Sequence, residues 1–481
     1  MTKRIISIII TAALFASCSK QKLDPIPQTA LSDANAFSDS ARCIQQINGA
    51  YSALKFGQMY AGRYQVYQDV RGEDFLNVTN NAVTAWLTWQ FNLTPSANEV
   101  QNFWSSAYTC INRCNVGIPG IQGAPIRDEL KLQLVAELKT IRAIAYFTLL
   151  QLYARPYSEA NGSQPGLPLR LSPETSAGNN DMPRSTVAEV YDQILRDLNE
   201  AETDLVSDYG TALLNTTRAH KNTAIALKTR VYLNMGNWAQ VIAEGNKIVP
   251  AAAPWQSPAR VANRLMPTIA TVFQSPYTTA ESILSMPFQA LDLPGTQNGL
   301  GHYFNPGPDG NGDFSLNTTG NGILADAGWR STDARRNFNV VASGRTWLRK
   351  WPNNPGSNPD WSPVIRYAEV LLNVAEAEAR SNASVSARAL AILNAVRKRS
   401  DPTIADFAPA TATELVNRIL TERRIELLGE GFRSSDVARL RQNFRSKGVV
   451  AEVPYEANAY LWPIPLSEIL VNRAIQQNPG Y

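Results

Sequence analysis

The sequence predicts a mainly α-helical fold built from helical hairpins, with a large loop-rich insertion in its C-terminal half. Apolar residues recur at helical spacing in several long stretches, and short polar turns join neighbouring stretches into pairs. Between Pro250 and Pro363 this period disappears, and Pro, Gly and Trp residues accumulate instead. Because the helical hairpins extend across every candidate boundary, we expect one large unit after the N-terminal segment.

The clearest hairpin occupies residues 364–399. Its first helix is interrupted between Ser381 and Ser384, and its second helix stops at Asp401-Pro402. The apolar faces consist of Ala368, Leu371, Leu372, Ala375 and Ala379 in the first helix and of Ala389, Ile392, Leu393 and Val396 in the second. One hairpin cannot bury this stripe alone, so the pattern indicates that further hairpins pack against it.

A second hairpin occupies residues 221–249. The turn at Gly236-Asn237 joins its two helices, and the second helix opens with Trp238. This layout resembles the tetratricopeptide unit, a helical hairpin that stacks on its neighbours. Because no fixed period repeats along the chain, we expect a tetratricopeptide-like scaffold with insertions and not a regular solenoid.

The remaining elements are predicted from period and capping signals. Thr186-Val187-Ala188-Glu189 and Thr411-Ala412-Thr413-Glu414 are capping boxes, each of which opens a helix. The predicted helices are 40–56, 99–118, 130–152 (the longest), 187–205, 412 to about 430, and one short helix within 461–481. Residues 58–94 and 159–184 are predicted to be irregular, and residues 281–288 are predicted to form a short strand.

The N-terminus has the layout of a secretory signal. Lys3 and Arg4 precede an apolar run that ends at Phe15, and the small residues Ala16 and Ser17 stand before Cys18. Small residues directly before a cysteine resemble a bacterial lipobox, so we expect residues 1–17 to be removed and Cys18 to carry lipid. An ordinary signal peptide with a chance cysteine is the alternative.

Charge and cysteine content exclude some classes of protein. Without Lys3 and Arg4, 45 − 2 = 43 basic residues face 41 acidic ones, a balance that does not suggest nucleic acid. After Cys18, the chain holds Cys43, Cys110 and Cys114. We expect these three to be small buried side chains, although Cys43 has the option of pairing with either of the others.

Several motifs together resemble the SusD/RagB family, the glycan- and nutrient-binding outer-membrane lipoproteins of Bacteroidetes. These motifs are the lipobox at Cys18, AELKTIRAIAYFTLLQLY (136–153) before Gly-Leu-Pro-Leu (166–169), ALKTRVYLNMGNW (226–238), RYAEVLLNVAEAEAR (366–380), LNAVRKRS (393–400), ERRIELLGEGFRSSDVARL (422–440), and the ending PIP…QNPGY. The resemblance runs nearly end to end and does not depend on one motif.

The resemblance implies a SusD-like α-α superhelix formed by residues 18–481, with an N-terminal part over 18–240 and a C-terminal RagB/SusD part over 260–481. It also implies a lipid-anchored protein of the outer membrane, exposed on the cell surface. Its implied partner is a SusC-type TonB-dependent transporter, over which the lipoprotein sits as a lid. Members of the family bind an oligosaccharide or another nutrient and deliver it without cleaving it.

Enzyme chemistry finds little support in the residues. Only two histidines occur, His220 and His302, and the chain has no H-E-x-x-H, G-x-S-x-G or phosphate-binding loop motif. A glycosidase-like carboxylate pair stays an unfavoured alternative. Glu422, Glu426 and Glu430 lie among Arg423, Arg424 and Arg433, which indicates structural ion pairs. We therefore predict no catalytic residues and no cofactor.

A calcium site is also disfavoured. The run from Asp309 to Asp313 imitates the start of an EF-hand loop, but Phe314 stands where that loop needs Gly. Gly320 stands where the bidentate Glu belongs. The run therefore predicts a Gly-rich turn, and no metal ligand is predicted.

A glycan site needs aromatic faces to stack on sugar rings and carboxylates or amides to bind hydroxyls. Trp104 and Trp238 fall on helical stripes and are predicted to be core. The predicted ligand contacts lie in segments without a helical period: Asp74, Trp86, Trp89, Tyr303 and Trp329. Convergence of residues 58–94 and 250–363 on one exposed aromatic cleft would favour a binding protein. Buried aromatics would favour a structural subunit of the transporter complex.

Overall fold

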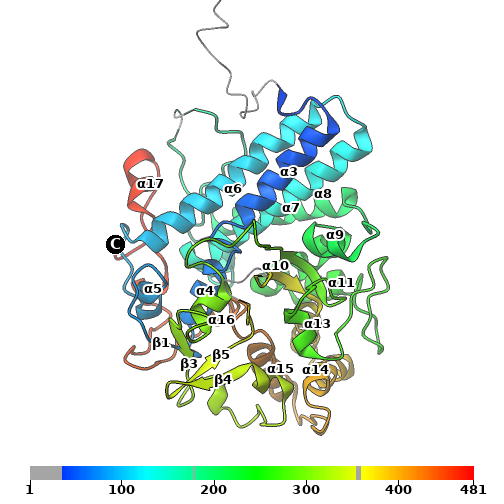
Figure 1. The fold of residues 1–481 in the computed structure, drawn as a ribbon, viewed down its shortest axis with the longest axis vertical. Coiled ribbons are helices and arrows are strands. Elements are labelled where there is room, and N and C mark those ends of the chain that lie inside the picture. Colours follow the sequence, from blue (N-terminus) through cyan, green and yellow to red (C-terminus); the bar gives the residue numbers. More distant parts are fainter. Residues whose placement is uncertain (1–34, 177, 179, 354–358) are drawn as a thin grey trace, which may run out of the picture.

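The computed structural model describes residues 35–176, 178, 180–353 and 359–481. Cys18 and the predicted signal segment therefore lie outside the described residues. Over the described part the fold is mostly helical, as predicted from the sequence. In Figure 1 four long helices lie side by side at one end of the molecule, and the short strands that the figure labels gather toward the other end.

The four long helices form the N-terminal helical layer. They are α3 (Ser40–Leu54), α6 (Asn98–Gln122), α7 (Asp128–Tyr153) and α8 (Val187–Asp204). Helix α7 packs against the other three and is the longest, with 26 residues, as the sequence predicted. Thr186 and Glu189 form the predicted reciprocal capping box at the start of α8.

The two predicted hairpins are confirmed. The first consists of α10 (Lys221–Met235) and α11 (Trp238–Gly245), and Gly236 adopts a φ of 72° between them. The second consists of α13 (Tyr367–Ser381) and α14 (Ala387–Ser400). Helix α13 packs against α10, α11 and α15 (Ala412–Glu426), so the hairpins bury their apolar stripes against one another.

The prediction that residues 58–94 are irregular is wrong. They contain α4 (Arg63–Val70), the strand β1 (Phe75–Asn77) and α5 (Trp86–Gln90). All eight residues of α4 are buried, polar ones included. A helix that is buried on every side has no alternation of apolar and polar faces, so its period is absent from the sequence.

The insertion is joined to the scaffold by antiparallel strand pairs. Strand β2 (Ser282–Met286) pairs with β6 (Ser362–Arg366), and β3 (Phe314–Leu316) pairs with β1, while β4 (Asn339–Ala342) and β5 (Arg345–Leu348) form a hairpin. The strand predicted over 281–288 is thus confirmed. Residues 364–366, which the sequence assigned to a helix, belong instead to β6.

The other elements are short. The α-helices are α9 (Ala212–Thr217), α12 (Leu300–Phe304), α16 (Arg433–Arg439) and α17 (Leu466–Val471). The 3₁₀ turns are Ala160–Gly162, Ile269–Phe273, Ile323–Ala325, Ala334–Phe338 and Asn458–Tyr460. The expected single short helix near the C-terminus is α17, and the separate helix α16 was not predicted.

Buried ion pairs attach the insertion to the C-terminal helices. Arg366 binds Glu281 of the insertion at 2.7 Å, and it binds Glu426 of α15 at 2.6 Å. Arg335 of the insertion binds Glu422 at 2.6 Å and Glu426 at 2.8 Å. The structural ion pairs predicted for Glu422, Glu426 and Glu430 are confirmed, but Arg423, Arg424 and Arg433 are not their partners.

A shared apolar core contains residues from Cys43 to Ile475. Cys43, Cys110 and Cys114 are buried free thiols, as expected. Among the described helices, none has the length and apolar character needed to cross a membrane.

Candidate functional site

Asp74 directly precedes β1 and is almost completely buried. Its carboxylate accepts hydrogen bonds from Arg424 Nε at 2.9 Å and from the backbone N–H of Ile323 at 2.8 Å. A buried carboxylate paired with a guanidinium in this way holds the two segments together. Asp74 is 1% exposed, so it offers no open oxygen to a ligand in this structure.

Three of the four predicted aromatic contacts are also core residues. The Trp89 indole is 4% exposed and donates to the carbonyl of Phe75 at 2.9 Å. Tyr303 is buried, with its hydroxyl donating to the Gln297 carbonyl at 2.7 Å. Trp329 is 3% exposed, and the Arg336 guanidinium lies 4.5 Å from its ring centroid. These three rings are therefore buried, although their segments show no helical period in the sequence.

Trp86 differs because its ring is only half-buried, on α5. Segments 58–94 and 250–363 do converge, through the β1–β3 pair and the stacking of Phe75 on Phe304 at 4.7 Å. They converge as a packed core, which consists of β1, β3 and the residues packed on them, Asp74, Trp89 and Phe304. We call this core the β1–β3 region. A ligand role for Asp74, Trp86, Trp89, Tyr303 and Trp329 stays a prediction, and Trp86 alone keeps an accessible part of its ring.

The acidic side chains at the two ends of the Gly-rich turn are engaged within the fold. Asp309 pairs with Arg349, and Asp313 accepts a hydrogen bond from Asn311 Nδ2 at 2.7 Å. Nowhere in the described ranges do three His, Cys, Asp or Glu side chains form a group that could hold a metal ion.

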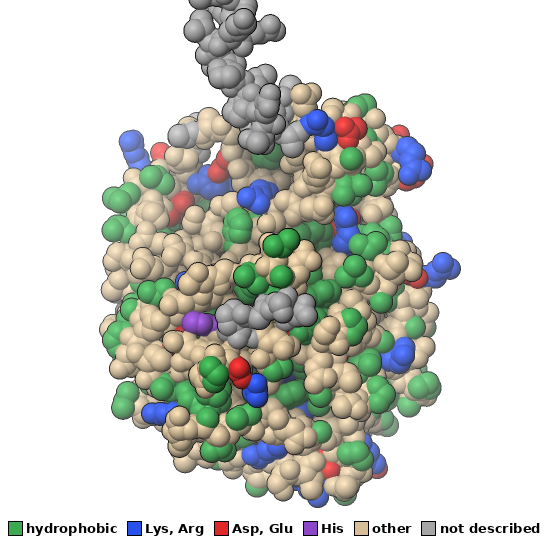
Figure 2. All heavy atoms as spheres, in the orientation of Figure 1, with side chains coloured by type: hydrophobic (Ala, Val, Ile, Leu, Met, Phe, Trp, Pro, Cys, Tyr) green, Lys and Arg blue, Asp and Glu red, His purple; other side chains and the backbone are tan. Residues whose placement is uncertain are grey.

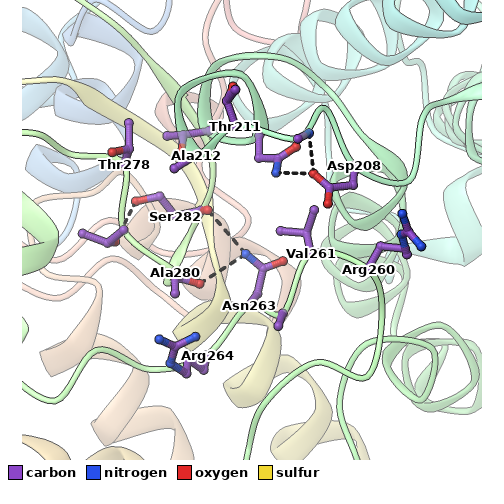
Figure 3. A pocket seen from close by; sticks show the side chains of 15 residues that line it. Asp208, Thr211, Ala212, Arg260, Val261, Asn263, Arg264, Thr278, Ala280 and Ser282 are labelled. Atoms are coloured by element: carbon purple, nitrogen blue, oxygen red, sulfur yellow. Dashed lines mark hydrogen bonds between the residues drawn. The ribbon is translucent and has the colours of Figure 1, made fainter.

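An open cavity of about 410 Å³ lies elsewhere, beside the short helix α9. We call it the α9 pocket. Its walls come from three separate segments, around α9, over 260–264 and over 278–282 (Figure 3). The lining residues are Asp208, Gly210, Thr211, Ala212, Asn215, Thr216, Arg260, Val261, Ala262, Asn263, Arg264, Thr278, Thr279, Ala280 and Ser282.

Asn263 fixes the floor of the α9 pocket. It is 1% exposed, donates to the carbonyl of Ala280 at 3.2 Å and accepts from Asn222 Nδ2 of α10 at 2.8 Å. The Arg264 backbone N–H also donates to the Ala280 carbonyl, at 3.0 Å. These bonds hold segment 260–264 against both α10 and the start of β2, so the pocket is preformed.

Asp208 supplies the carboxylate of the pocket. Its Oδ1 atom accepts hydrogen bonds from Asn215 Nδ2 at 2.8 Å and from the Gly210 backbone N–H at 2.7 Å. These bonds, led by the one from Asn215, lower the pKa of Asp208 below its ordinary value. The group is therefore an anion with its geometry already set.

The cations of the pocket are Arg260 and Arg264, and both are exposed. Among the described residues, neither guanidinium has a hydrogen-bond or salt-bridge partner in the fold. Figure 3 shows the two side chains on opposite sides of Asn263, with Asp208 on the side of Arg260. The pocket thus presents donors that the protein itself leaves unused.

His220 lies behind the pocket wall, at the position that precedes α10. The imidazole is completely buried, and burial lowers its pKa to about 4. At neutral pH it is uncharged, so it adds no cation to the pocket.

Sequence reasoning did not find the α9 pocket. Its residues are common loop types, and no spacing connects its three segments before the chain folds. On the face displayed in Figure 2, basic and acidic side chains are scattered among neutral ones.

Family models cover most of the chain. Residues 16–233 match a model described as "Starch-binding associating with outer membrane", and residues 325–481 match the model of the SusD family. Among curated proteins, SusD-like protein P2 of Formosa agariphila is 24% identical over the full length of both chains. SusD-like protein P38 of the same organism is 22% identical over 98% of each chain.

Solved structures share the fold. A laminarin-binding SusD-like protein superposes with a TM-score of 0.70 at 20% identity, over 92% of this chain and 100% of that one. A SusD superfamily protein from Bacteroides fragilis superposes with a TM-score of 0.81 at 30% identity, over 92% of this chain and 99% of the other. With both halves matched by the family models and this relative aligned almost end to end, the chain belongs to the SusD family.

Proposed function

We propose that this protein binds an oligosaccharide in the α9 pocket at the outer membrane and delivers it to a SusC-type TonB-dependent transporter. The observation that supports this proposal is an open, preformed cavity of about 410 Å³ whose lining residues are mostly polar. Its size falls in the range of roughly 300–1,000 Å³ typical of small-ligand sites. The binding of laminarin by a protein of the same fold supports a glycan as the ligand class.

The lining suits a ligand rich in hydroxyl groups. Sugar hydroxyls both donate and accept hydrogen bonds, so a matching site needs carboxylate acceptors together with guanidinium and hydroxyl donors. Asp208, Arg264 and Thr278 supply one of each around the same cavity. We infer no catalytic step, because capture and release of the ligand need none.

Binding is tested by titrating purified protein with a panel of oligosaccharides in a calorimeter. Ala212→Trp, which places an indole in the pocket wall, is expected to abolish the binding found for the wild type. Ala239→Trp, on the exposed surface of α11 and outside the pocket, is the matched control and is expected to bind normally. Full binding by Ala212→Trp would place the site elsewhere.

Membrane attachment through Cys18 is proposed on the sequence pattern alone. Lipid on this residue would make a stable anchor once two or three acyl chains are present. Cys18→Ala is expected to abolish palmitate labelling and to release the protein from the membrane fraction. Unchanged membrane retention in cells without the transporter would contradict the lipoprotein assignment.

A structural subunit of the transporter complex is the second candidate. The observation that favours it is the burial of Trp89, Tyr303 and Trp329, which leaves Trp86 as the only predicted aromatic contact with a partly accessible ring. A protein that assembles with the transporter yet binds no member of the oligosaccharide panel would establish this alternative.

A further inference from the structure

We propose that the α9 pocket selects acidic saccharides, those bearing carboxylate or sulfate groups, through Arg260 and Arg264. This inference rests on the proposed glycan-binding function and narrows its ligand class.

The unused groups of the pocket are mainly donors. The side-chain amides of Asn263 and Asn215 already form hydrogen bonds within the protein. The Ser282 hydroxyl donates to the Tyr277 carbonyl at 3.1 Å. Within the described part of the chain, the guanidinium groups of Arg260 and Arg264 and the Thr278 hydroxyl have no such partner. A ligand that fills the cavity must therefore supply acceptors.

The charge of the pocket is positive. Two guanidinium groups face one carboxylate, Asp208, so the lining carries a net charge of +1 (2 − 1). Asp208 feels the field of Arg260 and partly compensates it, whereas Arg264 lies on the far side of Asn263 (Figure 3).

The nearest groups behind the pocket do not change this balance. Glu281, beside Ser282, forms ion pairs with Arg366 at 2.7 Å and with Arg399 at 3.0 Å. His220 is buried and neutral at physiological pH. An anionic group near Arg264 thus meets a cation that forms no salt bridge with any carboxylate of the described residues.

The walls of the pocket strengthen the inference. None of the residues that line it is aromatic. Neutral sugars gain much of their affinity by stacking C–H groups on aromatic faces, a contact that this cavity does not offer. A guanidinium instead provides a planar pair of donors that matches a carboxylate or sulfate in a bidentate fork. The affinity of the site therefore depends on charge.

The test compares matched ligands on the full-length mature protein at low salt. The probes are oligogalacturonate, a sulfated galacto-oligosaccharide and a neutral galacto-oligosaccharide, each followed by calorimetry. An acidic probe is expected to bind at least about tenfold more tightly than the neutral one, the size expected for one charged hydrogen bond. Binding is expected to weaken at about 0.5 M salt, because the arginines are exposed and screened.

Variants identify the groups responsible. Arg264→Ala and Arg260→Ala are each expected to weaken binding of the acidic probe about tenfold and to weaken binding of the neutral probe by a clearly smaller factor, because a hydrogen bond to a neutral hydroxyl is weaker than one to an anion. Arg264→Lys is expected to retain sulfate binding better than carboxylate binding, because Lys lacks the planar fork. Arg345→Ala removes an exposed arginine of β5 outside the pocket and serves as the control for general charge.

The outcomes separate selection of acidic saccharides from glycan binding in general. Preferred binding of the neutral probe, or acidic binding that Arg260→Ala and Arg264→Ala leave intact, overturns the inference while glycan binding stands. If wild-type protein binds none of the three oligosaccharide probes, the result counts against both the inference and the proposed function. A comparison of the two acidic probes then tells which anion the site prefers.

Discussion

The β1–β3 region and the α9 pocket are both assembled from segments far apart in the sequence, but they satisfy their polar groups in opposite ways. In the β1–β3 region Asp74 is paired with Arg424, and the Trp89 indole donates to a backbone carbonyl. In the α9 pocket Arg260 and Arg264 have no partner among the described residues. In the first region the polar groups hold the fold together. In the second, the guanidinium groups remain available to a ligand.

This difference shows why residue type alone is a poor guide to a glycan site. Aromatic rings in segments without a helical period met the chemical requirement for stacking, yet three of them are buried in the core. An aromatic ring gains most free energy when it is fully buried, so an isolated Trp or Tyr tends to be drawn into the core. Exposed arginines gain little from burial and remain at the surface.

The largest expected effect is on stability in the β1–β3 region. Trp89→Ala removes a buried ring and its hydrogen bond to Phe75, and we expect it to lower the free energy of unfolding by about 3–5 kcal/mol. Denaturant unfolding followed by fluorescence measures the change. A loss below about 1 kcal/mol, with weakened glycan binding, would instead support the ligand contact expected from the sequence.

The second effect concerns the wall behind the α9 pocket. His220 has a pKa of about 4 when folded, against an ordinary value of about 6.5. Between these values the unfolded chain binds a proton that the folded chain does not, so stability falls as the pH drops from about 6.5 toward 4.

Measured against His220→Gln, the wild-type protein is expected to lose about 3 kcal/mol of relative stability across this range. Other titrating groups are common to both proteins and cancel in the difference. Denaturant unfolding at several pH values gives the result, and a difference that does not vary with pH would contradict the burial of His220.

A third, smaller effect is expected at Asp74. Asp74→Asn removes the charge that Arg424 faces and is expected to cost about 1.5–3 kcal/mol. The control is Asp406→Asn, which breaks an exposed pair with Lys398 whose side chains are 63% and 43% exposed and should cost under about 1 kcal/mol. Equal losses for the two variants, measured by thermal unfolding, would mean that Asp74 is not a structural anchor.

The fourth prediction separates Trp86 from the buried aromatics. Because its ring is half-buried, Trp86→Ala is expected to cost about 1–2 kcal/mol, less than Trp89→Ala. Calorimetry with the same oligosaccharides then tests the ligand role predicted from the sequence. Weaker binding by Trp86→Ala would extend the site toward α5, and unchanged binding would leave the α9 pocket as the proposed site.

The smallest effect belongs to the pocket arginines. Arg260→Ala and Arg264→Ala remove side chains that lack a partner in the described fold, so the free energy of unfolding should change by less than about 0.5 kcal/mol. Thermal unfolding checks this. A large loss from either variant would show that the guanidinium supports the fold and is not held available for a ligand.

Local patterns predicted the regular helices well. The hairpins α10–α11 and α13–α14 repeat apolar residues at helical spacing over many turns, and the Thr186 capping box marks the start of α8. These signals depend on residues close together in the sequence, so they can be recognised without the tertiary structure. Helix α4 was missed because it is buried on all sides, and α9 because six residues are too short for a period.

Ion pairing shows where local reasoning ends. The sequence indicated that Glu422, Glu426 and Glu430 form structural ion pairs with the arginines beside them. Neighbours on a helix point in different directions, and the carboxylates of Glu426 and Glu430 instead bind Arg366. Arg424, in turn, binds Asp74. The residue types indicated the kind of interaction, but only the folded chain selected the partners.

The sequence by itself determined the family, the helical scaffold and the order of its hairpins, because periodicity, caps and family motifs are properties of short stretches. The tertiary structure decided which aromatics became core and where an open pocket remained. Those outcomes depend on which segments meet and on how completely their surfaces exclude water. Burial and charge compensation are therefore properties of the assembled fold that no local spacing encodes.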